Sequence, residues 1–192
     1  PDKPVIHGEV CFEGMGGKSW HDVQRFLFWS NIMMGTPGFS YGAEGIWQFN
    51  TEEILFGPSP AGNVWGNVPW EEAYMYQGSK ELGLGKKFLE GYDWWKLNPS
   101  QDRLESRGDD VGSLLFCAQI EEEYLFVYMF RKPARWRDYK VNGFMPGNTY
   151  DVTWFNPITG DIIHSELTAG DDGKISITQA PVMQDWILVI NI

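Results

Sequence analysis

The hydrophobic pattern of this chain changes near residue 98, and the change limits the folds that the chain can adopt. Before residue 98, short apolar runs alternate with segments whose apolar residues recur at helical spacing, an order that predicts parallel strands joined by crossover helices. After it, short alternating runs are separated by turn signals such as Asn156-Pro157-Ile158-Thr159-Gly160, which is typical of an antiparallel β-sandwich. The sequence therefore predicts an α/β portion over residues 1–98 and an all-β portion over residues 99–192.

The α/β portion contains two strand-and-helix units. The expected elements are a buried strand at residues 4–10, a helix from about Trp20 to Met34, a strand-like segment that begins at Gly38, and a helical segment from Trp70 to Leu89. Gly78 should interrupt the last segment, and Ser79 could cap the helix that follows. Two such units cannot close a sheet by themselves, because the outer strand edges stay unpaired.

The all-β portion is read from its alternating runs. Strands are expected at residues 114–120, 124–130, 150–155, 162–167, 175–178 and 186–190. Regularly spaced short strands with turns between them predict a sandwich of two antiparallel sheets.

Composition excludes some classes of partner. With 15 Lys and Arg against 26 Asp and Glu, the formal charge is −11, so nucleic acid is not expected as a partner. No apolar run approaches the roughly 20 residues that a membrane-spanning helix needs, so no membrane span is expected. Aromatic residues make up 16% of the chain and include 10 Trp, and such residues often line sites for amphipathic ligands such as sugars.

Glu9 is the first candidate catalytic residue, because it lies at the end of the expected strand, directly after Gly8 breaks the apolar run. In α/β barrels the active site lies at the carboxyl ends of the strands. A carboxylate there can attack an anomeric carbon if a second carboxyl group supplies the proton. Glu9 would then be the nucleophile, and Glu13 would orient it or contact a substrate hydroxyl. The alternative for Glu9 is a solvated loop carboxylate.

A second group of candidates follows the next strand-like segment. Tyr41, Glu44, Trp47 and Gln48 are predicted to bind substrate, with Trp47 as a platform for a sugar face and Gln48 or Asn50 as a partner for sugar hydroxyls. The alternative for Trp47 is a core residue under the loop. No metal-ligand spacing and no nucleotide-binding, zinc-protease or hydrolase motif occurs, so neither a metal nor a cofactor is expected.

Two further side chains have structural alternatives. His7 could form a hydrogen bond at the site, although a core histidine with satisfied ring nitrogens is the more ordinary outcome. Arg25 could pair with a site carboxylate, although an arginine on a solvated helix face is more common.

Four motifs in one order give the chain a family resemblance. The stretches KPVIHGEVCFEG, GFSYGAEGIWQFN, WWKLNPSQD and DVTWFNPITGDI resemble the C-terminal half of bacterial apiosidase-like glycoside hydrolases. The resemblance implies the last two βα units of a (β/α)8 barrel followed by an antiparallel β-sandwich, whose family name refers to collagen binding. Nothing in these residues supports collagen binding. Phe39 stands where the family more usually has His.

The resemblance also implies a function. Glu9 is implied as the nucleophile, with the acid/base carboxylate on an earlier strand outside this chain, in a glycoside hydrolase that acts on plant cell-wall polysaccharide or oligosaccharide outside the bacterial cytoplasm. Because the chain begins with Pro1 rather than Met, we expect processing or a fragment. The missing barrel portion, or another covering polypeptide, is then an expected partner, and the chain alone should lack glycosidase activity.

The second hypothesis is of another class. The sandwich could be a non-catalytic carbohydrate-binding or structural module attached to a barrel remnant. Exposed aromatic residues would favour sugar binding, whereas burial of Trp94, Trp95 and Trp154 against the barrel portion would favour a structural wedge. Of the two, the wedge is the expectation.

Overall fold

The structure is a computed structural model that describes residues 3–9, 11–55, 66–105, 114–130, 139–177, 180–182 and 184–192. The chain divides into two compact units. Unit 1 comprises Pro1–Ile32 and Thr36–Lys87, and unit 2 comprises Met33–Gly35 and Phe88–Ile192.

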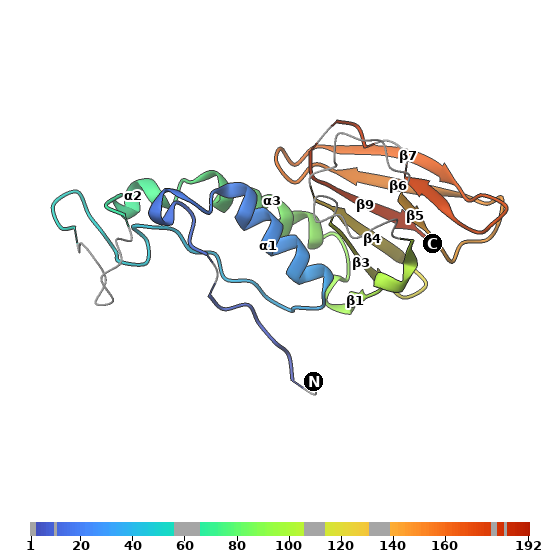
Figure 1. Ribbon diagram of the computed structural model, residues 1–192, viewed down its shortest axis with the longest axis horizontal. Coiled ribbons are helices and arrows are strands. Elements are labelled where there is room, and N and C mark those ends of the chain that lie inside the picture. Colours follow the sequence, from blue (N-terminus) through green and yellow to red (C-terminus); the bar gives the residue numbers. More distant parts are fainter. Residues whose placement is uncertain are drawn as a thin grey trace. The chain divides into compact units, whose positions relative to one another are not determined.

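Unit 1 is built mainly from α1 (His21–Met33) and α3 (Gln77–Leu89), with the single-turn helix α2 (Trp70–Ala73) and the 3-10 turn η1 (Met15–Gly17). The helices α1 and α3 lie side by side (Figure 1). Gly85 permits this approach, because a Cβ there would lie 2.7 Å from the Phe28 ring and 3.1 Å from the Trp29 ring. The predicted helix from about Trp20 to Met34 is confirmed.

The predicted interruption of the helical segment near Gly78 is confirmed, but the predicted cap at Ser79 is wrong. The helical segment breaks at residues 74–76, and α3 begins at Gln77, so Gly78 and Ser79 lie in its first turn. Gly78 does not end the helix. Its missing side chain leaves room for the Glu13 carboxylate, as described for the site below.

The predicted strands of unit 1 are reduced to isolated bridges. His7 pairs with Phe39, and Glu13 with Ala43, in parallel orientation. The parallel direction agrees with the alternation of strand and helix. Of the buried strand predicted at residues 4–10, the described residues 4–9 form only the bridge at His7, and Val5 and Ile6 are exposed; Val10 lies outside the described residues. Parallel strands are stable when both faces and both edges are covered, and the described part of this unit provides a single neighbouring segment.

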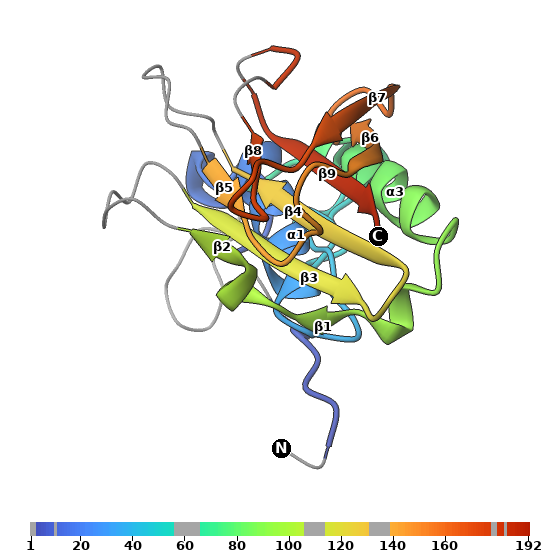
Figure 2. The ribbon, with the colours of Figure 1, turned by 90° about the vertical axis from the view of Figure 1, so that its right-hand side faces the viewer.

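Unit 2 contains a six-stranded and a three-stranded sheet, both antiparallel (Figure 2). The larger sheet has the order β1-β3-β4-β9-β6-β7 and the smaller has the order β2-β5-β8. The strands are β1 (Asn98–Pro99), β2 (Leu104–Glu105), β3 (Leu115–Ile120), β4 (Tyr124–Met129), β5 (Tyr139–Val141), β6 (Thr149–Phe155), β7 (Ile162–Thr168), β8 (Ile175–Ile177) and β9 (Trp186–Asn191). The six predicted strands are confirmed, except that Thr178 lies outside the described residues.

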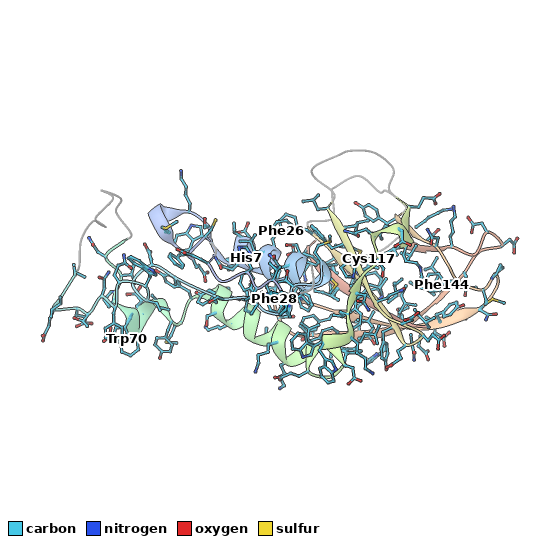
Figure 3. The ribbon with its side chains drawn as sticks, turned by 90° about the horizontal axis from the view of Figure 1, so that it is seen from below. His7, Phe26, Phe28, Trp70, Cys117 and Phe144 are labelled. Atoms are coloured by element: carbon cyan, nitrogen blue, oxygen red, sulfur yellow. The ribbon has the colours of Figure 1, made fainter. Side chains whose placement is uncertain are left out.

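One hydrophobic core joins the two sheets. Leu125 and Val127 of β4 and Ile190 of β9 pack with Val141 of β5 and Ile175 of β8, so inward-facing residues of both sheets share one cluster. Figure 3 labels Cys117 and Phe144, which are also members of this cluster. The antiparallel sandwich predicted for the all-β portion is therefore present.

The other face of the larger sheet is covered by the last residues of α3 and the segment that follows them. The Phe88 ring stacks on Phe155 with 4.0 Å between centroids, and the Tyr92 ring meets Phe126 edge-on at 5.0 Å. This explains why β4 and β9 are buried on both faces.

No helix in the described part of the chain is long and apolar enough to cross a membrane.

Candidate active site

Glu13 is the most constrained of the candidate residues. Its side chain lies in unit 1, and the residue is only 1% exposed. The Tyr41 hydroxyl donates a hydrogen bond to Glu13 Oε2 at 2.6 Å, and the Gly78 backbone N–H donates one to Glu13 Oε1 at 3.1 Å. Each carboxylate oxygen therefore has a partner inside the protein, which a buried carboxylate requires.

The bond to Gly78 makes Glu13 a cap for α3. The first N–H groups of a helix have no partner within it, and a carboxylate at that end also meets the positive end of the helix dipole. Gly78 is needed for the approach, because a Cβ at this position would fall on Glu13 Oε2 and lie 3.1 Å from Gln24 Cγ. Glu13 thus fixes the start of a helix that lies 65 residues further along the chain.

Tyr41 stays a hydrogen-bond donor at all ordinary pH values. Burial is the main cause that raises the pKa of the Tyr41 hydroxyl, and the bond to Glu13 and its charge raise this pKa further. Because the Tyr41 hydroxyl keeps its proton, it remains able to donate its hydrogen bond to Glu13 Oε2.

Glu44 forms a second carboxyl–phenol pair beside the first. The Glu44 backbone N–H donates to the Glu13 carbonyl oxygen at 2.9 Å, and the Tyr76 hydroxyl donates to Glu44 Oε1 at 3.0 Å. Burial raises the pKa of the Glu44 carboxyl, and the bond from Tyr76 partly opposes this rise. Two glycines enclose the carboxyl group: a Cβ at Gly14 would lie 2.7 Å from Glu44 Oε1, and one at Gly66 would fall on Oε2.

Glu9 has the opposite environment. Its side chain is exposed, and within the described residues its carboxylate has no hydrogen-bond or ion-pair partner. Two carboxylates four residues apart in the sequence therefore differ completely in surroundings: Glu9 is open to solvent, whereas Glu13 is enclosed.

Trp47 and Gln48 lie on a turn that runs from Gly45 to Asn50. The Gly45 N–H donates to Gln48 Oε1 at 2.9 Å, so the amide oxygen of Gln48 holds the turn, while its buried Nε2 has no hydrogen-bond partner among the described residues. Trp47 is 54% exposed, with its ring 6.3 Å from that of Phe12. The alternative of a core tryptophan under the loop is therefore wrong.

His7 and Arg25 differ from their ordinary alternatives. The buried Nδ1 of His7 has no hydrogen-bond partner among the described residues, so His7 is not a satisfied core histidine. Arg25 is buried and donates to Glu81 Oε2 at 2.5 Å, which joins α1 to α3 and excludes a solvated helix face.

No group of three or more His, Cys, Asp or Glu in the described ranges is arranged to hold a metal ion.

The sequence did not single out Tyr76, Gly78 as a capping position, or Glu81. Their partners lie 32, 65 and 56 residues away, and no local pattern identifies a contact of that range. The glycine itself was the one usable signal for Gly78, since a glycine inside a helical pattern often marks a close approach.

Comparison with solved structures defines the class to which this fold belongs. A glycoside hydrolase aligns with a TM-score of 0.78 at 18% identity over 98% of this chain, and a glycoside hydrolase family 5 protein from Bacteroides vulgatus aligns with a TM-score of 0.77 at 18% identity over all of it. A glycoside hydrolase family 30 xylanase from Clostridium acetobutylicum aligns with a TM-score of 0.51 at 9% identity over all of this chain and 43% of its own. These likenesses show a fold found in glycoside hydrolases. The chain spans 42% of the length of each of the first two.

The sequence places the chain more narrowly. A family model described as the apiosidase-like catalytic domain matches residues 1–96. The chain therefore belongs to the apiosidase-like family and is a glycoside hydrolase-related protein, as the four motifs had indicated. A search of curated proteins found no match.

Proposed function

We propose that this chain is part of a retaining glycoside hydrolase in which Glu9 is the nucleophile and the acid/base carboxylate lies outside the chain. The observation that carries this proposal is the contrast between Glu9 and Glu13. An attacking carboxylate needs a free oxygen that substrate can reach, and Glu9 is exposed and unpaired among the described residues. Both oxygens of Glu13 are already occupied.

In this mechanism a Glu9 oxygen forms a bond to the anomeric carbon while the bond from that carbon to the leaving oxygen breaks. The external acid/base donates its proton to the leaving oxygen, then takes a proton from the water that releases the sugar from Glu9. Glu44 does not fit the acid/base role, because Gly14 and Gly66 enclose its carboxyl group. The acid/base is therefore assigned to a segment outside residues 1–192.

Some of the remaining candidate residues are free to contact substrate, and the others support the structure of the site. Trp47 is the member exposed enough to carry a sugar face, and Gln48 has an unpaired Nε2 that could bind a hydroxyl. Glu13, Tyr41 and Glu44 were predicted to bind substrate. Their surroundings favour a supporting role, in which they hold the segment that follows Glu9 against α3.

The proposed domain organisation and substrate rest on membership of the apiosidase-like family. Residues 1–98 would be the last two βα units of a (β/α)8 barrel, completed by a barrel portion outside this chain, and residues 99–192 would be an accessory sandwich; the family match over residues 1–96 and the partial coverage of the similar glycoside hydrolase support this proposal. The substrate would be a plant cell-wall polysaccharide or oligosaccharide, met outside the cytoplasm of a bacterium.

The test uses a Glu9→Ala variant of the protein extended to include the barrel portion. Removing the nucleophile should abolish hydrolysis of an aryl glycoside, and added azide should restore turnover and yield a glycosyl azide, because a small anion can occupy the space of the lost carboxylate. Unchanged thermal unfolding would show that the fold is intact. Full activity of the variant without azide would refute the assignment, and the unextended chain should be inactive in the same assay.

A second candidate function rests on a cavity in unit 2. The cavity has a volume of about 430 Å³ and is lined by Trp95, Lys96, Asn98, Ile120, Glu121 and Glu123. Trp95 is 66% exposed, and an open indole beside amide and carboxylate groups favours sugar binding over a structural wedge at this position. Trp154 does not bear on the choice, since it is buried inside the sandwich against Trp186. Loss of polysaccharide binding in Trp95→Ala would support a binding module, and unchanged binding would exclude this second function.

A further inference from the structure

Three aromatic rings form a row on unit 1, outside the site already described. The Phe49 and Trp70 rings stack with 5.6 Å between centroids and 6° between planes, and the Trp70 and Tyr74 rings lie 6.1 Å apart at 42°. Trp70 is labelled in Figure 3. Phe49 is 64% exposed, and Tyr74 is exposed as well. We call these three residues the aromatic row.

The aromatic row is held by the backbone on which it is built. The Trp70 N–H donates to the Asn50 carbonyl oxygen at 2.8 Å, and the Asn50 N–H donates to the Gly45 carbonyl oxygen at 2.9 Å. The buried Asn50 side chain also donates to the Gly66 carbonyl oxygen at 3.3 Å and to that of Val68 at 3.4 Å. These bonds connect the turn that carries Phe49 to the start of α2, so the rings are positioned before any ligand arrives.

Phe49 occupies a backbone conformation that disfavours its own side chain. Its φ is +56°, in the left-handed region, where asparagine and glycine are favoured and a bulky residue is an outlier. Burial offsets little of this cost, because most of the side chain faces solvent. Strained residues cluster at ligand sites, where the strain is tolerated for function. An exposed ring at a position better suited to asparagine therefore indicates a ligand.

The position of the aromatic row and the charges near it limit the class of ligand that it can bind. Phe49 lies on the same Gly45–Asn50 turn as Trp47, so a polymer that crosses Trp47 can continue onto the aromatic row. Exposed acids lie close in sequence to two of the rings: Glu52 and Glu53 come shortly after Phe49, and Glu71 and Glu72 directly follow Trp70. Their charges repel anions over roughly a Debye length, about 8 Å at physiological salt.

We propose that the aromatic row is a second saccharide-binding site, which takes uncharged sugar residues of a polysaccharide beyond the residue bound at Glu9. This inference rests on the proposed function and adds the class of sugar and a binding site for it. The flat, apolar face of a neutral pyranose stacks on the exposed rings, and binding energy from this remote part of the substrate is available to the reaction at Glu9.

The test is electrophoresis of the intact 192-residue chain through native gels that contain neutral arabinoxylan, xyloglucan or galactomannan, or anionic polygalacturonate. The informative variant is Phe49→Asn, which removes the ring and relieves the backbone, so its thermal midpoint should equal or exceed that of the parent. Met75→Ala is the matched control, since Met75 is an exposed apolar residue on the next turn and takes no part in the aromatic row.

At least one neutral polysaccharide should retard the parent chain and Met75→Ala, while the dissociation constant for Phe49→Asn rises by about tenfold or more. Equal retardation of Phe49→Asn, no retardation of the parent in any neutral gel, or stronger retardation in polygalacturonate would overturn the inference. Failure of the nucleophile assignment would appear only in the hydrolysis assay, and the two ideas are thus tested separately.

Discussion

The cap that Glu13 places on α3 can be measured with two alanine substitutions in one helix. Gly78→Ala adds a Cβ that would fall on Glu13 Oε2, so the carboxylate must move and its bond from the Gly78 N–H is lost. Gly83→Ala lies in the same helix, and its Cβ would meet nothing within 4 Å. Both changes gain helix propensity, so this contribution largely cancels when the two variants are compared.

The magnitudes follow from the contacts. A hydrogen bond to a charged acceptor contributes about 1.5–3 kcal/mol, and replacing glycine by alanine inside a helix contributes about 0.5–1 kcal/mol in the opposite direction. Gly78→Ala should therefore destabilise unit 1 by about 0.5–2.5 kcal/mol, whereas Gly83→Ala should stabilise it by about 0.5–1 kcal/mol. The difference between the two variants isolates the capping bond.

Urea unfolding followed by far-UV circular dichroism is the appropriate assay, because α1 and α3 lie mostly in unit 1 and dominate the helical signal. The reasoning would be refuted if Gly78→Ala were as stable as Gly83→Ala. Such a result would mean that Glu13 finds equivalent partners elsewhere and does not hold the start of α3.

Further predictions concern titration and reactivity. Because burial raises the folded-state pKa of Glu44 above its ordinary value of 4.5, this carboxyl favours the folded state most below that value, and its contribution is lost as the pH rises through the folded pKa. The thermal midpoint of Glu44→Gln minus that of the parent should therefore increase from acid to neutral pH, and a constant difference would contradict the assignment. Burial also raises the pKa of the Cys117 thiol to about 12, whereas Cys11 is exposed, so a thiol reagent should label Cys11 in the native chain and Cys117 only after urea is added. Rapid native labelling of Cys117 would show that the sandwich opens.

The sandwich could be predicted from the sequence because its signals are local. Asn156 and Gly160 specify the turn between β6 and β7. The Asn156 side chain accepts hydrogen bonds from the N–H groups of Ile158 and Thr159, and Gly160 has a φ of +83°. Alternation of apolar residues on either side of such turns fixes which face is buried. The short strands β1, β2 and β5 escaped prediction, because runs of two or three residues carry little periodicity; β8 is equally short but was predicted.

The candidate site could be predicted in part. The sequence placed Glu9 and Glu13 in one short segment and Tyr41 with Glu44 in another, and the structure connects these segments through the bridge between Glu13 and Ala43. It could not separate an exposed Glu9 from an enclosed Glu13, because the difference is made by Gly78, far along the chain. Local patterns report spacing, whereas the environment of a carboxylate depends on tertiary contacts.

The place of β9 in the larger sheet has a consequence for how the protein is made. This strand comes after all the other described strands in the sequence, yet it lies between β4 and β6, with Tyr124 paired to Asn191. During synthesis, β3, β4, β6 and β7 leave the ribosome without the strand that joins the two halves of their sheet. The sandwich therefore stays incomplete, with two open strand edges, until translation reaches Asn191, and a nascent chain paused earlier would present those edges to chaperones.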